Sequence, residues 1–224
     1  MPSTSLPVYE KKFAAFLFDM DGTLIDSSGS TLRVWGAWAV RNGLDPVTFL
    51  PTIHGVRGID TITKLALPGL DPAEEAAGIL AAEIDDVHDI VAIPGVVAFL
   101  NALPSTGWAI VTSAPAELAK RRLAAAGVPV PDIMVTSEDV IAGKPHPQCF
   151  LLGAERLGVA IEDCIVFEDA HAGITAGESA GAALMVITAT HDRPIETPHA
   201  TIHSYEALST FTDEDGWISI LKAA

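Results

Sequence analysis

Two aspartates separated by a single residue are the chemically most informative feature of this sequence. The stretch Asp19-Met20-Asp21-Gly22-Thr23-Leu24 directly follows an apolar run at residues 13–18. Continuous apolar runs are typical of strands buried on both faces of a parallel sheet, and such sheets bind ligands beyond the carboxyl ends of their strands. Two unpaired carboxylates about 4 Å apart repel by roughly 4 kcal/mol at an effective dielectric constant near 20. Asp19 and Asp21 therefore indicate a cation or a shared proton, unless they form a solvated acidic turn.

Further polar side chains lie at or near the ends of other apolar runs. Thr112 and Ser113 follow residues 108–111, Glu168 and Asp169 follow residues 165–167, and Lys144 lies in a loop between them. Taken singly, each has a simpler interpretation as a helix cap or a solvated loop residue. Taken together, they bring two carboxylate pairs, hydroxyls and an ammonium to one edge of one predicted sheet.

The chemistry that such a set can perform is phosphoryl transfer. Carboxylates are hard oxygen ligands that suit Mg²⁺, which also binds phosphate oxygens. When a cation and Lys144 neutralise those oxygens, an aspartate can attack phosphorus and form an acyl phosphate. A second aspartate, two residues on and on the same side of an extended segment, is placed to protonate the leaving oxygen and then to accept a proton from water.

The elements that must position these groups alternate between strand and helix patterns. Alternation of this kind predicts an α/β fold with a Rossmann-like, doubly wound parallel sheet. The expected strands lie at residues 14–18, 108–111, 133–135, 165–167 and 183–187. About 90 residues separate the first two, far more than one crossover helix needs. A turn and a short edge strand are expected near residues 213–221.

The long separation predicts an inserted α-helical cap domain at residues 29–92, with the core formed by residues 1–28 and 93–224. A helix is expected over residues 30–41, and another begins at Asp71-Pro72, where Asp is a good cap and Pro a good first residue. Their expected apolar stripes are Leu32, Trp35, Trp38 and Ala39, and then Leu80, Ile84, Val87 and Val91. The connections, a flexible segment at residues 27–30 and a stiff one at 92–95, could serve as paired hinges.

Bulk composition restricts the class of protein. The 224 residues carry 13 basic and 29 acidic side chains, a formal net charge of −16, which disfavours nucleic acid and anionic membranes as partners. The sequence contains no apolar run of membrane-spanning length and opens on nothing like a secretory signal, so we expect a cytoplasmic, soluble protein, with a monomer favoured. Cys149 and Cys164 lie in apolar segments and are expected to be core residues.

In their order, the motifs resemble those of the haloacid dehalogenase superfamily, most closely its branch of sugar-phosphate phosphatases and beta-phosphoglucomutases. The resemblance rests on four stretches that span nearly the whole chain, namely residues 19–24, Val111-Thr112-Ser113, Gly143-Lys144-Pro145 and Glu168-Asp169-Ala170-His171-Ala172-Gly173. It implies a Mg²⁺-dependent enzyme that acts on a small phosphomonoester.

The resemblance also implies a role for each motif residue. Asp19 is the implied nucleophile and Asp21 the implied general acid and base. Thr112, with Ser113 beside it, and Lys144 are the implied phosphate-binding residues. The implied metal ligands are Asp19, Asp169 and the main-chain carbonyl of Asp21, with Glu168 ranked lower because it ligates directly only in some relatives.

Substrate selectivity is expected from the cap. His54-Gly55-Val56-Arg57 resembles a cap loop that faces the active site in sugar-phosphate phosphatases, so His54 and Arg57 are candidate substrate-binding residues. The equally weighted alternatives are a surface arginine for Arg57 and a packed or exposed ring for His54. Trp35 and Trp38 are expected in the cap core.

Three functions compete. The first is a phosphatase for a small phosphorylated sugar or polyol that works through an aspartyl phosphate. The second is a phosphosugar mutase like beta-phosphoglucomutase, but mutases of that branch carry a histidine where this chain has Thr31, which favours hydrolysis. The most distant is a receiver-like domain that accepts a phosphoryl group, which is half as long and has no inserted cap. A dehalogenase is disfavoured because its chemistry needs neither Asp21 nor Asp169.

Overall fold

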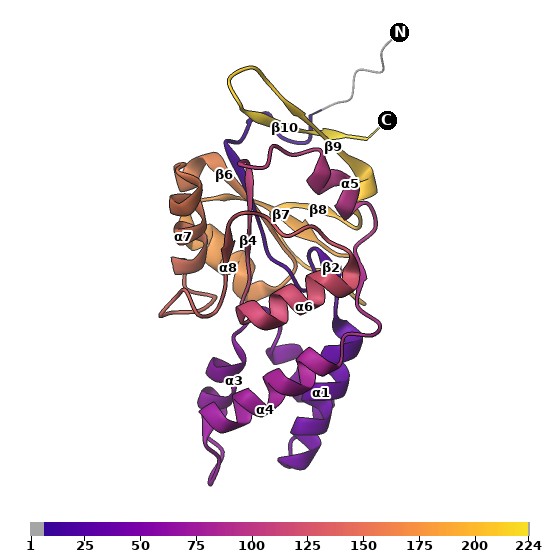
Figure 1. Cartoon of the computed structure of the whole chain (residues 1–224), viewed down its shortest axis with the longest axis vertical. Helices are drawn as coiled ribbons and strands as arrows, with labels where there is room; N and C mark the ends of the chain where they lie inside the picture. Colours follow the sequence, from indigo (N-terminus) through magenta and orange to yellow (C-terminus); the bar gives the residue numbers. More distant parts are fainter. Residues whose placement is uncertain (1–6, 224) are drawn as a thin grey trace.

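The computed structural model describes residues 7–223 and contains a six-stranded, entirely parallel sheet (Figure 1). The strand order is β5-β4-β1-β6-β7-β8, so the order reverses at β1, which has β4 on one side and β6 on the other. All five strands predicted from apolar runs are confirmed, and β8 is an addition. The strands are β1 (Ala15–Phe18), β4 (Trp108–Val111), β5 (Met134–Val135), β6 (Cys164–Glu168), β7 (Ala183–Ile187) and β8 (Ala200–Ile202).

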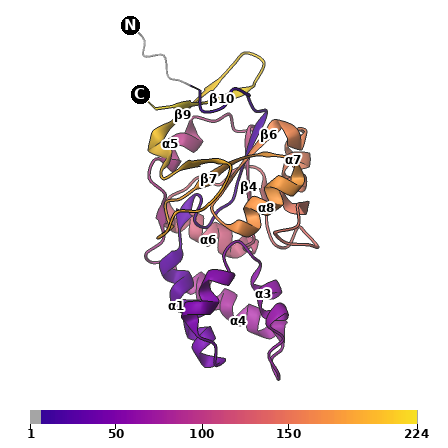
Figure 2. The same ribbon diagram turned by 180° about the vertical axis from the view of Figure 1, so that it is seen from behind.

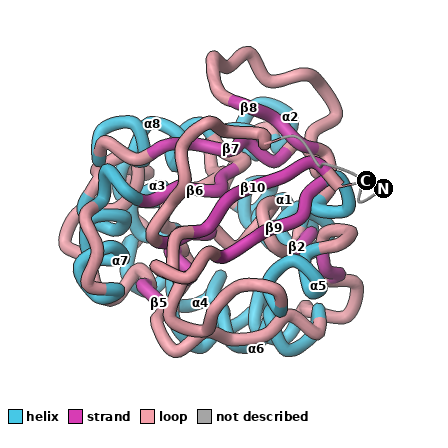
Figure 3. The backbone as a smooth tube through the Cα atoms, turned by 90° about the horizontal axis from the view of Figure 1, so that it is seen from above, coloured by secondary structure: helices cyan, strands magenta, loops and turns pink. Residues whose placement is uncertain are grey.

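Helices cover both faces of the sheet, which explains why its central strands are apolar throughout. Along β1, Phe16 and Phe18 pack towards α5 (Val96–Asn101) and α6 (Ala116–Ala126), whereas Leu17 packs towards α7 (Gln148–Leu157) and α8 (His171–Ala180). The view from above shows α7 and α8 on one side of the strands and α5 and α6 on the other (Figure 3). The predicted doubly wound α/β fold is thereby confirmed.

The segment between β1 and β4 holds a group of helices that lies beyond one end of the sheet (Figures 1 and 2). We call residues 28–85 the helical unit. It packs around its own apolar cluster, which includes Trp35, Trp38 and Phe49, as expected for the two tryptophans. The unit contains α1 (Ser28–Arg41), α2 (Pro46–Phe49), a 3₁₀ turn (Leu50–Thr52), α3 (Gly58–Leu65) and α4 (Pro72–Asp85).

Local signals explain where these helices begin, and the structure corrects three details. The side chain of Asp71 accepts hydrogen bonds from the amides of Ala73 and Glu74, as its position before Pro72 predicted. Residues 28–30, expected to be a flexible connection, instead form the first turn of α1. Leu32 is exposed on α1. Val87 and Val91, expected on the apolar stripe of the second helix, both lie after α4 has ended, where Val87 is buried and Val91 is exposed in a short strand.

The two connections between the sheet and the helical unit lie side by side. β2 (Ile25–Asp26) enters the unit and β3 (Val91–Ala92) leaves it, and the two strands pair in an antiparallel ladder. The helical unit is therefore connected to the sheet by two hydrogen-bonded strands that lie side by side, and not by two separate linkers.

The far end of the molecule is closed by a hairpin of β9 (Leu208–Thr212) and β10 (Ile218–Lys222) (Figure 1). The expected C-terminal strand exists, but it pairs within this separate two-stranded sheet and is not an edge strand of the main sheet. Cys149 and Cys164 are buried free thiols, as predicted. Across residues 7–223, no helix combines the length and apolar character that a membrane span requires. The expected location, monomeric state and lack of a nucleic-acid partner stay predictions.

Candidate active site

The residues singled out from the sequence converge at the carboxyl end of the sheet, where the strand order reverses. A cavity of about 1340 Å³ lies there, between the strand ends and the helical unit. Asp19 and Asp21 follow β1, Thr112 follows β4, and Asp169 follows β6, and all four line this cavity. In a doubly wound sheet a crevice forms where the strand order reverses, so the strand order determines where this cavity lies.

A buried ion-pair network joins the first, third and fourth motifs. The ammonium of Lys144 donates to Oδ1 of Asp19 at 2.6 Å, to Oε1 of Glu168 at 2.8 Å and to the carbonyl of Val111 at 3.1 Å. The other oxygen of Glu168 accepts the backbone amides of Asp169 and Ala170. Both oxygens of Glu168 are thus occupied, and this carboxylate holds Lys144 in place.

Burial sets the protonation of these groups. Removal from water raises the pKa of Asp19 to about 7, although the ammonium of Lys144 opposes this shift. Burial, together with the neighbouring charges of Glu168 and Asp19, raises the pKa of Asp169 well above its usual range. Burial alone disfavours the ammonium of Lys144, but the two carboxylates beside it outweigh that effect and raise its pKa. Three carboxylates, those of Asp19, Glu168 and Asp169, are thus gathered around the single ammonium of Lys144, so negative groups outnumber positive ones in this cluster.

The donor set fits a divalent cation. Asp19, Glu168 and Asp169 each offer a carboxylate oxygen, and these oxygens lie within 4.8 Å of one another. Oδ1 of Asp169 is buried without a hydrogen-bond partner among the described residues. A β-carbon on Gly22 would lie 2.1 Å from the other oxygen of Asp169, so only glycine leaves room for this carboxylate. Hard oxygen donors gathered in this way suit Mg²⁺.

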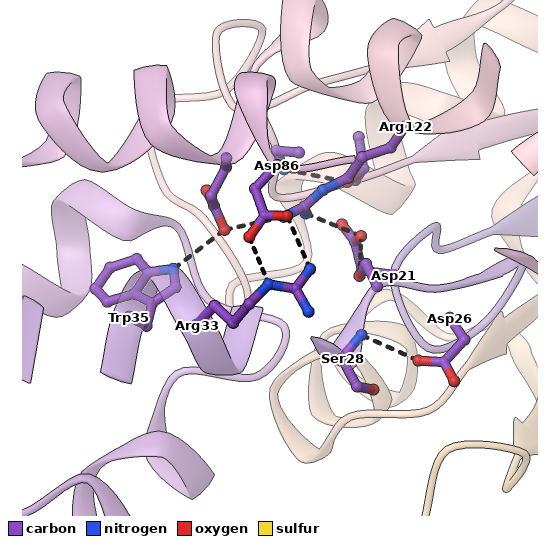
Figure 4. A network of polar contacts seen from close by, with 11 residues as sticks. Asp21, Asp26, Ser28, Arg33, Trp35, Asp86 and Arg122 are labelled. Atoms are coloured by element: carbon purple, nitrogen blue, oxygen red, sulfur yellow. Dashed lines mark hydrogen bonds and ion pairs between the residues drawn. The ribbon is translucent and has the colours of Figure 1, made fainter. Parts of the chain in front are cut away.

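Asp21 is held by residues that sequence reasoning did not identify. Its Oδ1 accepts a hydrogen bond from the hydroxyl of Ser27 at 2.6 Å. The same oxygen accepts one from Nη1 of Arg122 at 2.9 Å (Figure 4). Arg122 also donates from Nη2 to Glu83 on α4, at 2.9 Å. A signal was present, because Arg122 lies four residues after the buried Leu118 and therefore on the inward face of α6.

The two hydroxyls after β4 have different partners. Thr112 is buried, and its Oγ1 accepts the amide of Ala114 at 3.1 Å, so it shapes the turn before α6. Ser113 donates to the carbonyl of Gly55 at 2.8 Å and so contacts the helical unit. Both residues line the cavity, and their role towards phosphate stays a prediction.

The two candidates from the helical unit also line the cavity. Burial and the nearby His191 lower the pKa of His54. The guanidinium of Arg57 is bound by Asp60 and donates to the carbonyls of Val140 and Ile141, at 3.0 Å each, in the loop that precedes Lys144. The sequence did not predict this link from the helical unit to the lysine loop, and a role of Arg57 towards substrate stays a prediction.

Comparison with known proteins identifies the family. A family profile described as hydrolase, haloacid dehalogenase-like hydrolase, matches residues 13–181. The chain is 38% identical to hexitol phosphatase A of Escherichia coli over 211 residues, which cover 92% of this chain and 97% of that protein. It is 35% identical to glycerol-1-phosphate phosphohydrolase 1 of Saccharomyces cerevisiae, over 86% of this chain and 81% of the relative.

A solved structure shares the fold over most of its length. A hydrolase from Pseudomonas syringae superimposes with a TM-score of 0.72 at 28% identity, over 80% of this chain and 86% of that one. The profile match alone extends over most of the chain and includes all four motifs. The chain therefore belongs to the haloacid dehalogenase-like hydrolases, as its motifs predicted.

Proposed function

We propose that this hydrolase is a Mg²⁺-dependent phosphatase that releases phosphate from a small phosphorylated sugar or polyol through an aspartyl phosphate on Asp19. The observation that carries the proposal is the buried set at the carboxyl end of β1, in which Asp19 contacts Lys144 and Asp21 lies two residues further on. The curated relatives support it, since the two named above are phosphatases of a hexitol phosphate and of glycerol-1-phosphate by name.

In the first step, a carboxylate oxygen of Asp19 attacks phosphorus while the bond from phosphorus to the substrate oxygen breaks. Asp21 gives its proton to that oxygen, so that a neutral alcohol departs. Lys144, buried and charged, holds negative charge on the phosphoryl oxygens, which lets a carboxylate approach.

In the second step, water attacks the phosphoryl group on Asp19. Asp21, now a carboxylate, accepts the proton of that water, and the bond between Asp19 and phosphorus breaks to release inorganic phosphate. The two steps together consume one water and yield one alcohol and one phosphate, and Asp21 returns to its protonated form.

The metal would be held by Asp19, Asp169 and the main-chain carbonyl of Asp21, with Glu168 in a supporting role because Lys144 and two amides already occupy it. When bound, Mg²⁺ would supply positive charge that neutralises phosphate oxygens during transfer. The orphaned Oδ1 of Asp169 supports this assignment, because a buried carboxylate oxygen without a partner is costly.

We propose that the expected cap domain at residues 29–92, most of which is the helical unit, selects the substrate and excludes bulk water. It forms one side of the cavity with both polar and apolar side chains. A cavity bounded in this way suits a small molecule, and hydroxyls such as that of Thr31 suit a polyol better than an apolar alcohol.

Phosphate release from a panel of monoesters tests the proposal. The panel holds a hexitol phosphate, glycerol-1-phosphate, a hexose phosphate and phosphoglycolate, each assayed with Mg²⁺ and after removal of metal by chelation. Asp19→Asn is the control, because it removes the nucleophile at nearly constant size. Release that requires both Mg²⁺ and Asp19 supports the phosphatase. Isomerised hexose phosphate formed faster than phosphate would favour the mutase instead.

A further inference from the structure

A network of buried ion pairs connects the helical unit to Asp21, the proposed general acid and base. Glu83 on α4 accepts Nη2 of Arg122 on α6, and Nη1 of the same guanidinium binds Asp21 after β1. Trp35 on α1 donates to the same oxygen of Glu83 at 3.2 Å, so two helices of the helical unit hold Glu83 in this network. Figure 4 shows Arg122 between Asp21 and the side of the unit that carries Trp35.

The hydrogen bonds at Asp21 are asymmetric. Ser27 and Arg122 both donate to Oδ1, and no hydrogen bond from residues 7–223 reaches Oδ2. A carboxylate rotates readily about its last bond, so two donors on one oxygen are what fix its plane. An oxygen that already accepts two hydrogen bonds is poorly placed to carry a proton. Oδ2 is therefore the oxygen that exchanges a proton with the substrate.

The burial of Arg122 makes this arrangement depend on the helical unit. Only 4% of Arg122 and 8% of Glu83 is exposed, and a buried guanidinium is stable only when it is paired. Because one of its two acidic partners belongs to the helical unit, docking of the unit decides whether Arg122 is shared between two carboxylates or bound to Asp21 alone.

We propose that Arg122 and Glu83 are positioning residues that orient the carboxylate of Asp21 for proton transfer when the helical unit is docked on the sheet. The inference rests on the proposed function, in which Asp21 protonates the leaving alcohol. Both residues line the cavity, but each contacts the proposed acid and base only through Oδ1 of Asp21: Arg122 binds that oxygen, and Glu83 binds Arg122. They fix the orientation of the Asp21 carboxylate. Their effect on the rate should therefore depend on how strongly departure of the leaving group requires a proton from Asp21.

Leaving-group dependence separates this role from a merely structural one. An alkyl phosphate such as glycerol-1-phosphate needs a proton on its departing oxygen, whereas 4-nitrophenyl phosphate departs as a stable phenolate. The ratio kcat/KM covers the steps up to release of the first product, so it reports this departure and not the later hydrolysis of the aspartyl phosphate.

The experiment compares kcat/KM for these two substrates in the full chain with Mg²⁺. We expect Arg122→Gln and Glu83→Gln to lower the value for glycerol-1-phosphate by about 10- to 100-fold while the aryl phosphate changes by less than about 3-fold. Arg122→Lys should restore part of the loss, because it returns one charged donor. Thermal melting of each variant checks that it is folded.

Matched controls are available on the same helices. Arg121→Gln removes an exposed arginine of α6 whose one side-chain hydrogen bond within residues 7–223 is to the carbonyl of Ile84. Glu75→Gln removes an acid of α4 that binds Trp38 and Arg41 inside the helical unit and has no partner in the sheet domain among the described residues. Both should leave the ratio between the two substrates unchanged.

Asp21→Asn distinguishes failure of the positioning role from failure of the proposed function. If Asp21→Asn lowers activity selectively on the alkyl phosphate but Arg122→Gln and Glu83→Gln lower both substrates equally, or neither, the positioning role is overturned and the proposed function stands. If Asp21→Asn itself shows no such selectivity, the proposed role of Asp21 is wrong, and the positioning role is overturned with it.

Discussion

The ammonium of Lys144 lies 2.6 Å from Oδ1 of Asp19, and both side chains are almost completely buried. This contact joins the first motif to the third across 125 positions of sequence. Glu168 completes the pair from the other side, so one ammonium balances two carboxylates. A buried carboxylate left without its partner is strongly destabilising, and the protein's stability therefore depends on a residue of the candidate active site.

Replacement of Lys144 by methionine is expected to destabilise the fold as well as abolish phosphate release. Two buried carboxylates would lose their shared cation, and we expect the free energy of unfolding to fall by about 3–5 kcal/mol. Urea unfolding measures this change. The double variant Lys144→Met/Glu168→Gln should regain part of the loss, because one charge fewer is left unpaired. Lys120→Met, on the exposed face of α6, is the control, and equal urea midpoints for the two single variants would contradict the prediction.

Protons and Mg²⁺ are expected to compete for the site. The pKa of Asp19 is about 7 in the folded, metal-free protein and near its ordinary value of 3.8 in the unfolded chain. Between these values the folded state binds a proton that the unfolded state does not, so this contribution to stability is present at low pH and is lost as the pH rises through about 7. Since Mg²⁺ binds the deprotonated carboxylate, its stabilising effect has the opposite trend.

Thermal melting with and without Mg²⁺ checks this expectation. The rise in melting temperature that Mg²⁺ causes should be larger near about pH 8 than near about pH 6. Asp169→Asn, which removes a proposed ligand, should abolish most of the rise at both values. A rise that does not depend on pH, or one that persists in Asp169→Asn, would place the ion elsewhere.

The sequence was sufficient to predict the sheet and the edge at which the candidate site lies, for a physical reason. Strands buried on both faces must be apolar throughout, and chemistry in this fold lies just past their ends, so Asp19, Thr112 and Asp169 could be located from local patterns alone. The family and its hydrolase class followed from the same four motifs and are confirmed. The start of α4 was equally local, since Asp71 and Pro72 determine it.

Long-range pairing was not predictable in the same way. Arg122 and Glu83 lie 39 positions apart, and only the packing of α4 against α6 brings them together. In sequence each resembles a charged residue on a helix, and only the buried positions beside them indicate otherwise. The pairing of β2 with β3 and the separate hairpin of β9 and β10 depend likewise on tertiary contacts, which a pattern of apolar residues does not specify.

Arg57 is expected to act as a docking contact between the helical unit and the lysine loop. Its guanidinium donates to the carbonyls of Val140 and Ile141, and a β-carbon on Gly143 would lie 2.6 Å from its Nε. Arg57→Ala should therefore lower kcat/KM by a common factor, about 10-fold, for every substrate in the panel. Gly143→Ala should have a similar effect, because it displaces the same side chain. A loss confined to some substrates would instead support direct binding of substrate by Arg57.

Gly22→Ala is expected to remove activity by two separable effects. Gly22 has φ +83°, where a β-carbon costs about 1–2 kcal/mol, and that carbon would also lie 2.1 Å from Oδ2 of Asp169. Gly216 has φ +87° with no atom within 4 Å of its β-carbon position, so Gly216→Ala carries the backbone strain without the clash. Both variants should lose comparable stability from the backbone, but only Gly22→Ala should displace Asp169, lose phosphate release by more than about 100-fold and fail to gain thermal stability from Mg²⁺. If Gly22→Ala keeps its activity, then catalysis does not depend on the position of the Asp169 carboxylate in this structure. If the two variants lose activity equally, the loss is caused by backbone strain alone.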